Sequence, residues 1–337
     1  MIIAVDAMGG DNAPQVVVEG VIQAVKEFST NIILVGDEQK IKQEIAKHNY
    51  SSNKISFVHA PEVIEMGESP VVALKKRKNS SINVAIDLLK AGKANALVSA
   101  GNTGAVVAAA TLNLKLLPGV ERAGIAVAIP TLKKLCLIID VGANISPRPT
   151  QLFQYAIMSK IYSEQILGKI NPKLGLLNIG EEESKGTDFI KETFNLFKKQ
   201  CLFDFIGYVE GQDIFRGDVD CVVCDGFVGN VVLKVAESLA ETITNLLKTE
   251  LNKNIFAKSL SFLLKPSLRR FKKELDYSEY GGAPLLGTQK VCIIAHGASS
   301  CKAIKNAIRV ANEFVGHQIN ESIIKTISLL KTQNFPC

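Results

Sequence analysis

Residues 94–114 read ANALVSAGNTGAVVAAATLNL, and none of these 21 side chains is charged. The length would suit a membrane-spanning helix, but a Gly-Asn-Thr-Gly turn in hydrocarbon would leave backbone N–H and C=O groups without partners. The stretch instead predicts a buried strand over residues 96–98, a tight turn, and a buried helix over residues 104–114. Such a turn aims backbone amides at the start of a helix, which suits a phosphate anion. An ordinary βα turn is an equal alternative at this point.

The rest of the chain repeats this alternation of short apolar runs and longer amphipathic segments. Ten apolar runs predict buried strands, at residues 2–5, 32–35, 55–58, 96–98, 125–129, 135–139, 174–178, 203–206, 221–224 and 291–295. Amphipathic helices are predicted over residues 15–28 and 188–199, the second capped by Thr187. Alternating strands and helices predict a three-layer α/β/α fold with a largely parallel sheet. We expect residues 1–337 to form a single α/β domain, which could divide into two subdomains.

Six predicted strands are followed by polar loops that contain glycine. These loops lie at residues 6–12, 99–104, 140–144, 178–186, 225–230 and 296–297. In open α/β sheets, ligands bind beyond the carboxyl ends of the strands. We therefore expect an active site where these loops converge on one crevice.

The composition is that of a folded protein with a large core, because 47% of the residues are hydrophobic and 21% are charged. The net charge of +6 comes from one segment of the chain, because residues 253–273 hold seven Lys and Arg and no acid. A nucleic-acid partner is therefore not expected. The seven cysteines and the first residues, which do not read as a signal peptide, predict a reduced, cytoplasmic protein.

Several catalytic motifs are absent, among them GxGxxG, GxxxxGK[ST], HExxH and GxSxG. Cys221 and Cys224 form a lone CxxC, whose side chains would face opposite sides of a strand, so no zinc site is expected. We expect no metal and no cofactor. The loops offer glycine, Asn, Ser and Thr, with Lys185 and His296. This set suits anion binding and oxyanion stabilisation, and a reaction that brings its own nucleophile, such as inorganic phosphate.

Five motifs, taken in order, resemble the bacterial phosphate acyltransferase family, the acyl-ACP:phosphate acyltransferases of phospholipid synthesis. The motifs are VDAMGGD at 5–11, SAGNTGA at 99–105, DVGAN at 140–144, DGF with GN at 225–230, and YGGA at 280–283. The resemblance runs from residue 1 to about residue 315. Asn12 stands where the family commonly has His, which weakens the case for a base at that position.

The resemblance implies a fold related to phosphotransacetylases and to isocitrate/isopropylmalate dehydrogenases, and a homodimer. It implies transfer of a long-chain fatty acyl group from acyl carrier protein to inorganic phosphate, giving acyl phosphate. The product would pass to the membrane glycerol-3-phosphate acyltransferase, so the expected location is cytoplasmic and peripherally membrane-associated. Two alternatives remain: a phosphotransacetylase-like enzyme of acyl-CoA and acetyl phosphate, and a non-catalytic scaffold at the membrane surface.

Three residues are predicted to be catalytic within this reaction. Lys185 would bind phosphate or developing negative charge, and Asn230 would donate to the oxyanion. His296 would protonate the leaving thiolate. The alternatives are a solvated loop lysine, a helix N-cap and a structural histidine. The predicted substrate-binding and phosphate-binding residues are Ser99, Gly101, Asn102, Thr103, Gly104, Asn144 and Gly229. The predicted loop-bracing acceptors, whose carboxylates would repel phosphate, are Asp6, Asp11, Asp140 and Asp225.

A helical excursion is predicted over residues 235–278, with a basic amphipathic segment at residues 253–275. Its mixture of apolar and basic side chains suits a membrane surface. A helical hairpin that packs in a dimer is the alternative. A second basic cluster, at residues 75–78, could steer the acidic carrier protein, but the pattern favours a solvated helix face.

Overall fold

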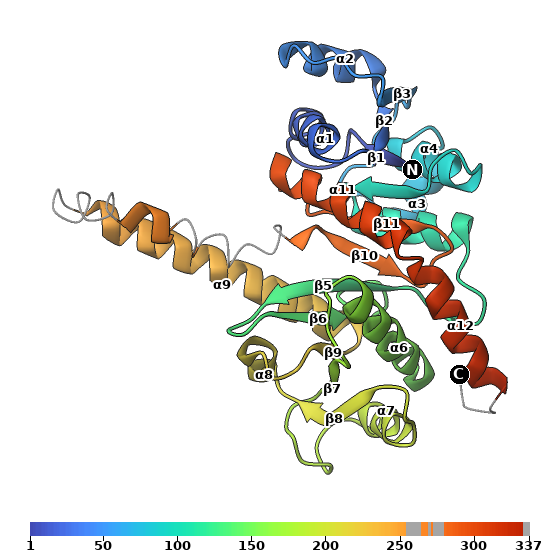
Figure 1. Ribbon diagram of the computed structural model, residues 1–337, viewed down its shortest axis with the longest axis vertical. Coiled ribbons are helices and arrows are strands. Elements are labelled where there is room, and N and C mark those ends of the chain that lie inside the picture. Colours follow the sequence, from blue (N-terminus) through green and yellow to red (C-terminus); the bar gives the residue numbers. More distant parts are fainter. Residues whose placement is uncertain (254–263, 269–270, 272–279, 333–337) are drawn as a thin grey trace.

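The computed structural model describes residues 1–253, 264–268, 271 and 280–332. Within these residues the chain forms one eleven-stranded sheet with helices on both faces (Figure 1). The strands are β1 (Ile2–Asp6), β2 (Asn31–Gly36), β3 (Ile55–His59), β4 (Ala96–Ser99), β5 (Gly124–Pro130), β6 (Leu135–Ile139), β7 (Lys173–Leu177), β8 (Asp204–Val209), β9 (Cys221–Val223), β10 (Ala283–Leu286) and β11 (Val291–Ile294). All ten predicted strands are present.

Helices fill most of the intervals between the strands. They are α1 (Gln15–Glu27), α2 (Glu38–Lys47), α3 (Pro70–Lys76), α4 (Ser81–Lys90), α5 (Thr103–Ala109), the π-helical segment η1 (Ala110–Leu114), α6 (Pro149–Gln165), α7 (Asp188–Lys198), α8 (Gly211–Arg216), α9 (Gly226–Asn252), α11 (Cys301–Gly316) and α12 (Ile319–Thr332). The helix predicted after the glycine turn is confirmed as α5 and η1 together.

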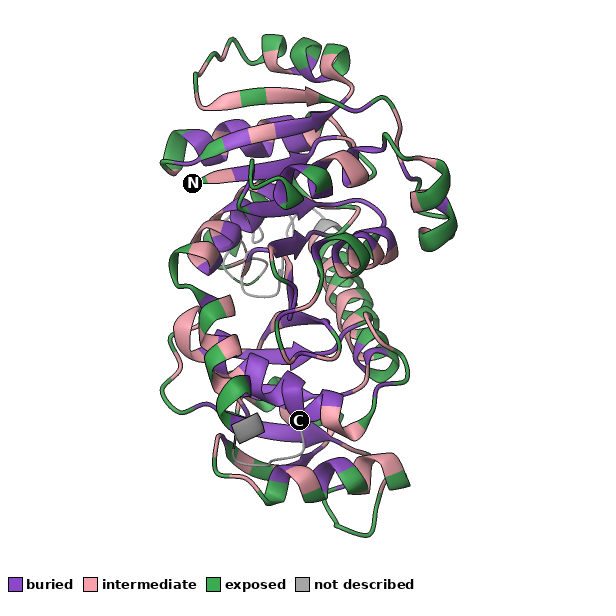
Figure 2. Cartoon of the chain, turned by 90° about the vertical axis from the view of Figure 1, so that its right-hand side faces the viewer, coloured by how far each residue is buried: buried purple, intermediate pink, exposed green. Residues whose placement is uncertain are grey.

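Side chains along a strand alternate between two hydrophobic cores, one on each face of the sheet. In β1, Ile3 and Val5 face the core that contains residues of α1, α6, α7, α11 and α12. Ala4 faces the core that contains residues of α3, α4, α5 and α8. Figure 2 shows the strands buried between these layers. The predicted three-layer α/β/α fold is confirmed.

The strand order is β3-β2-β1-β4-β11-β10-β5-β6-β9-β7-β8. The first five strands are mutually parallel, and so are the last four. Between these groups, β10 is antiparallel to β11 and β5, and β5 is antiparallel to β6. The sheet is therefore largely parallel, as predicted. Sequence analysis missed β10, a short strand that contains Pro284.

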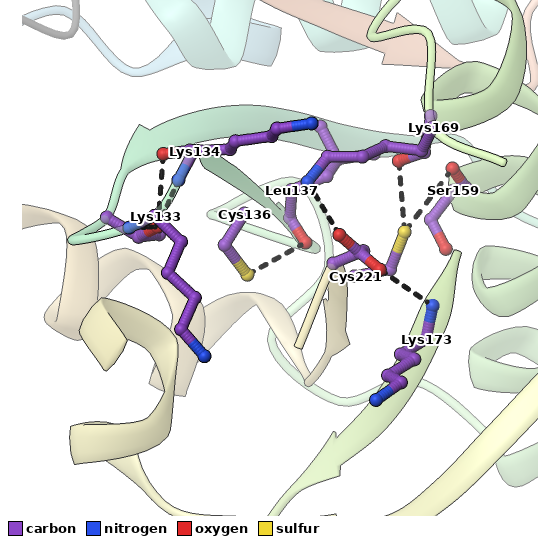
Figure 3. Close-up of polar contacts among 11 residues, drawn as sticks. Lys133, Lys134, Cys136, Leu137, Ser159, Lys169, Lys173 and Cys221 are labelled. Carbon is purple, nitrogen blue, oxygen red and sulfur yellow. Dashed lines mark hydrogen bonds and ion pairs between the residues drawn. The ribbon is translucent and has the colours of Figure 1, made fainter. Parts of the chain in front are cut away.

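The two cysteines of the CxxC lie on opposite sides of the sheet, as predicted. The Cys221 thiol donates to the Ser159 carbonyl at 3.7 Å, beside β6 and α6 (Figure 3). The Cys224 thiol donates to the Asp140 carbonyl at 3.5 Å, in the other core. Burial raises the pKa of the Cys221 thiol to about 12. Both cysteines are thus packing residues rather than a metal pair.

The long helix α9 starts beside β6 and projects from the body (Figure 1). It covers the first part of the predicted excursion at residues 235–278. Most of the predicted basic amphipathic segment, residues 253–275, lies outside the described residues. In the part of the chain that the structure describes, no helix has the length and apolar character needed to cross a membrane.

Candidate active site

The loops after β1 and β4 are held together by a buried carboxylate. Asp6 accepts hydrogen bonds from the Ser99 hydroxyl at 2.7 Å and from the Met8 N–H at 3.1 Å. Burial raises the pKa of Asp6, and hydrogen bonds from Ser81 and Ser99 offset part of that rise. The Ser99 hydroxyl also accepts from the Gly101 N–H at 3.1 Å. Asp6 therefore ties the loops after β1 and β4 together. The hydroxyl of Ser99 is engaged with Asp6 and Gly101, and its role in binding phosphate stays a prediction.

The Asn102 side chain is also engaged within the protein. Its oxygen accepts from the Ala105 N–H at 3.0 Å and caps α5. Its amide nitrogen donates at 3.1 Å to three backbone carbonyls, those of Glu65, Met66 and Glu68. The contact of this side chain with phosphate stays a prediction. Asn102 fixes the loop at residues 65–68 beside the glycine turn, and the sequence pattern carried no sign of that partner.

The start of α5 remains open to a ligand. Thr103 is exposed at the first position of the helix, and Gly104 follows it. The neighbouring loops approach so closely that a Cβ on Gly9 would lie 2.6 Å from the Gly101 nitrogen. Glycine is thus required where the β1 and β4 loops meet. The backbone of this turn, with the Thr103 hydroxyl, is what the structure leaves for the predicted phosphate cradle.

The loop after β11 joins the same group. The Asp11 N–H donates to the Gly297 carbonyl at 2.9 Å. Gly10 adopts a φ of +104°, and a Cβ there would lie 2.9 Å from the same carbonyl oxygen. Asp11 therefore ties two loops together through its backbone, and its side chain is exposed. The loops after β1, β4 and β11 form the first loop group.

A second buried carboxylate organises the loop after β6. Asp140 accepts from the N–H groups of Ala143 at 3.0 Å and Asn144 at 2.7 Å, and burial raises its pKa. The Asn144 amide donates to the Ala123 carbonyl at 2.6 Å and to the Tyr155 hydroxyl at 2.7 Å. Asp140 therefore holds this loop together. The Asn144 side chain is engaged within the protein, and its role in binding substrate stays a prediction.

The loop after β9 leads directly into α9. The Asp225 carboxylate accepts from the N–H groups of Phe227 and Val228, both at 3.0 Å, and caps the helix. Asn230 is therefore not the N-cap, and it lies inside the helix with its side chain exposed. A Cβ on Gly229 would collide with the Asp140 carbonyl oxygen. Gly229 thus lets α9 approach the Asp140 loop, and its contact with substrate stays a prediction.

Asn230 and Lys185 lie on the second loop group, formed by the loops after β6, β7 and β9. A Cβ built on Gly142 would lie 3.6 Å from the Asn230 side-chain oxygen. Lys185 is exposed on the loop after β7. That loop is closed by the Asn178 amide, which donates to the carbonyls of Gly180 at 3.0 Å and Lys185 at 3.4 Å. The structure therefore presents both predicted side chains at the surface of this group.

His296 connects the two loop groups through α9. Its Nε2 lies 3.2 Å from Lys234 Nζ and 3.9 Å from the Glu237 carboxylate. Its Nδ1 accepts from the Ala298 N–H at 3.2 Å. The contact between His296 and α9 thus links the loops after β1, β4 and β11 to those after β6, β7 and β9.

The sequence of the chain places it among known proteins. It matches the family described as fatty acid synthesis protein over residues 1–322. The phosphate acyltransferase of Dictyoglomus turgidum is 48% identical over 97% of this chain and 98% of its own length. That of Geobacter sulfurreducens is 49% identical over 96% of this chain and 93% of its own length. The chain belongs to the phosphate acyltransferase family. The resemblance of the five motifs is thereby confirmed, and the chain is an acyltransferase of fatty acid synthesis.

Solved structures support the fold expected for this phosphate acyltransferase. A phosphotransacetylase from Streptococcus pyogenes superposes with a TM-score of 0.61 at 16% identity, over 95% of this chain and 94% of that one. A putative 4-hydroxythreonine-4-phosphate dehydrogenase from Salmonella typhimurium superposes with a TM-score of 0.51 at 13% identity, over 93% and 98%. The predicted relation to phosphotransacetylases and to a dehydrogenase-like fold is therefore confirmed.

Two neighbours of His296, Lys234 and Glu237 on α9, were not singled out from the sequence. They follow Asn230 at helical spacing, a signal that would have grouped them once α9 was known to start at Gly226. Their contact with His296 depends on how α9 packs, which local sequence does not show. Among the described residues, no cluster of three or more His, Cys, Asp or Glu could hold a metal ion.

Proposed function

We propose that this phosphate acyltransferase moves a long-chain fatty acyl group from acyl carrier protein to inorganic phosphate, giving an acyl phosphate for phospholipid synthesis. One observation supports this most strongly: a single face of α9 lies between the two loop groups. Asn230, Lys234 and Glu237 share this face because they are spaced i, i+4, i+7. Lys234 contacts His296, whereas Asn230 lies against Gly142. A thioester carbonyl at this face would meet an amide donor, a cation and an imidazole.

In the proposed reaction a phosphate oxygen attacks the thioester carbonyl carbon and forms a C–O bond. The carbonyl oxygen becomes an oxyanion that accepts a hydrogen bond from Asn230, an interaction worth roughly 3 kcal/mol in comparable sites. The intermediate then collapses, the C–S bond breaks, and the electron pair leaves on sulfur. The proton of monohydrogen phosphate passes to the thiolate, with His296 as the relay. The products are acyl phosphate and the free thiol of the carrier.

This chemistry relies on position and charge rather than on a protein nucleophile. Phosphate is largely a dianion at neutral pH, because its second pKa lies at about 6 by analogy with phosphate esters. No strong base is then needed. Lys185 is the proposed cation that offsets the negative charge, and the Thr103 turn is the proposed phosphate cradle. Asp6 and Asp140 are engaged with their own loops, so their carboxylates do not face the phosphate.

The acyl carrier protein is the proposed donor partner. Lys75, Lys76 and Lys78 are exposed at the end of α3 and suit an acidic partner. Arg77 of the same cluster pairs with Glu68 at 3.0 Å. The Glu68 carbonyl in turn receives the Asn102 amide. The basic cluster is thus connected to the first loop group, where the carrier would deliver its thioester.

Homodimer formation and contact with the membrane surface are further parts of the proposal. The projecting part of α9 exposes large apolar side chains at spacings of three and four residues: Val231, Val235, Leu239, Ile243, Leu246 and Leu247. Such a row suits a second copy of the helix. The product, a long-chain acyl phosphate, is poorly soluble and would pass best to the membrane glycerol-3-phosphate acyltransferase. We therefore propose a cytoplasmic enzyme that is peripherally associated with the membrane.

The proposal is tested by incubating the purified protein with palmitoyl-acyl carrier protein and phosphate. Mass spectrometry should detect palmitoyl phosphate and the free carrier thiol, without nucleotide or added metal. Acetyl-CoA with phosphate is the comparison that represents a phosphotransacetylase-like enzyme. An absolute requirement for NAD, ATP or a divalent ion would overturn the proposal, as would a strong preference for acetyl-CoA.

A further inference from the structure

A cavity of about 870 Å³ opens beside the second loop group. Its size falls within the range of roughly 300–1,000 Å³ that is typical of small-molecule sites. Large apolar side chains form much of its wall: Ile145, Leu177, Ile179, Phe189, Ile190, Phe227 and Val228. Three of these side chains remain strongly exposed, Ile145 at 71%, Ile179 at 81% and Phe227 at 63%. Exposed apolar side chains gathered around a cavity favour an apolar ligand.

Three polar side chains in the wall already have partners within the protein. The Asp225 carboxylate caps α9, and the Thr187 hydroxyl accepts from the Ile190 N–H at 3.4 Å. The Asn178 amide donates to the carbonyls of its own loop. A ligand rich in amides or charges, such as the prosthetic arm of the carrier, would therefore find few partners in this cavity. A hydrocarbon chain needs none.

The cavity lies at the start of α9, next to the residues of the proposed reaction centre along the chain. Its residues Phe227 and Val228 form the first turn of α9, and Asn230 lies in the next turn. Asn178, which lines the cavity, binds the carbonyl of Lys185. A thioester whose carbonyl lies at Asn230 would have the cavity within reach of its acyl chain.

We propose that this cavity holds the acyl chain of the donor thioester, an inference that rests on the proposed function for its substrate. The chain would bury its methylenes against Leu177, Phe189 and Ile190 while the carbonyl stays at α9. Each methylene buried should raise kcat/KM by about fourfold until the cavity is full. The cavity would then set the preference for long acyl groups.

A binding experiment tests this without turnover. Fluorescence titration with cis-parinaric acid, a fluorescent fatty acid, reports occupancy of an apolar site. Ile179→Asp should weaken binding roughly tenfold or more, because it places a charge in the apolar wall. Ile170→Asp is the matched control, since Ile170 is 96% exposed and lies outside the cavity. Equal affinities for the two variants would overturn the proposal.

A turnover experiment separates this inference from the proposed function. Butyryl, octanoyl, dodecanoyl and palmitoyl thioesters of the carrier are compared with phosphate as acceptor. In Ile179→Asp the rise of kcat/KM with chain length should flatten, whereas Ile170→Asp should behave as wild type. If kcat/KM rose equally steeply with chain length in both variants, the role of the cavity in binding the acyl chain would be contradicted, but the proposed function would not. If the wild type turned over none of the thioesters, the proposed function would be contradicted. The fluorescence titration would still test whether the cavity binds an acyl chain.

Discussion

Asp6 and Asp140 hold corresponding places in the two loop groups. Each lies at the carboxyl end of a strand, is buried, and accepts hydrogen bonds from the loop that it begins. Their expected role as braces rested on the repulsion between carboxylate and phosphate. The structure adds the mechanism, because their oxygens take up loop N–H and hydroxyl groups that would otherwise lack acceptors. At the residue scale, polar side chains of the types that commonly bind ligands here fix the conformation of the backbone.

Asp6 should leave a signature in the pH dependence of stability. Its pKa is raised above the ordinary value of 3.8, so the folded protein holds this proton more tightly than the unfolded chain. Its contribution to the free energy of unfolding therefore falls as pH rises above 3.8. In urea unfolding, the free energy of unfolding of Asp6→Asn should increase relative to that of the wild type as the pH rises through this window. The free energy of unfolding of Asp87→Asn, at an exposed aspartate, should not. Parallel profiles for wild type and Asp6→Asn would refute the role of its burial.

Asn230 and Lys185 should each matter to turnover rather than to folding. Asn230→Ala and Lys185→Ala should lower kcat by roughly 10²-fold, the scale of a lost oxyanion donor. Both side chains are exposed, so thermal stability should change little. Asn245→Ala on the outer part of α9 and Lys199→Ala after α7 are the controls. Near-normal kcat in either test variant would remove that residue from the mechanism.

At the scale of elements, α9 determines how the site is assembled. Asp225 caps it so that it starts at Gly226, four residues before Asn230. This start places Asn230, Lys234 and Glu237 on one face. The lack of a side chain at Gly229 then lets this part of the helix pack against the Asp140 carbonyl.

Gly229→Ala tests that packing. The added methyl group would meet the backbone of the Asp140 loop, so the helix must shift, at a cost of roughly 1–3 kcal/mol. Gly211→Ala is the matched control, because it is also a helical glycine near a helix start and its added methyl group would meet open space. Denaturant unfolding measures both variants. A stability change no larger for Gly229→Ala than for Gly211→Ala would show that the close approach does not matter.

The strands were predictable because each is a short apolar run between glycine-containing loops, and the sheet is covered on both faces. The strand β10 was not, since Pro284 argues against a strand and β5, one of its two antiparallel partners, is distant in sequence. The same limit applies to the site. Lys185, Asn230 and His296 were proposed from loop position and family motifs. The partners of Ser99, Asn102 and Asn144 lie at long range, where local patterns carry no information.

At the scale of the whole molecule, we expect the apolar row on α9 to mediate dimer formation. Light scattering during gel filtration should give the mass of a dimer. Leu239→Glu with Leu246→Glu should shift the protein toward a monomer, because charges would replace apolar contacts between copies. Leu132→Glu, at a side chain that is 88% exposed elsewhere, should leave the mass unchanged. A monomeric wild type would contradict the proposed homodimer.

The central claim is that phosphate itself attacks the thioester, with no acyl-protein intermediate. It is tested most directly by mixing excess protein with palmitoyl-acyl carrier protein and following thiol release together with the intact mass of the protein. The account predicts no thiol release until phosphate is added, then one acyl phosphate for each thiol and an unchanged protein mass. Thiol release without phosphate, accompanied by a palmitoylated protein, would contradict it.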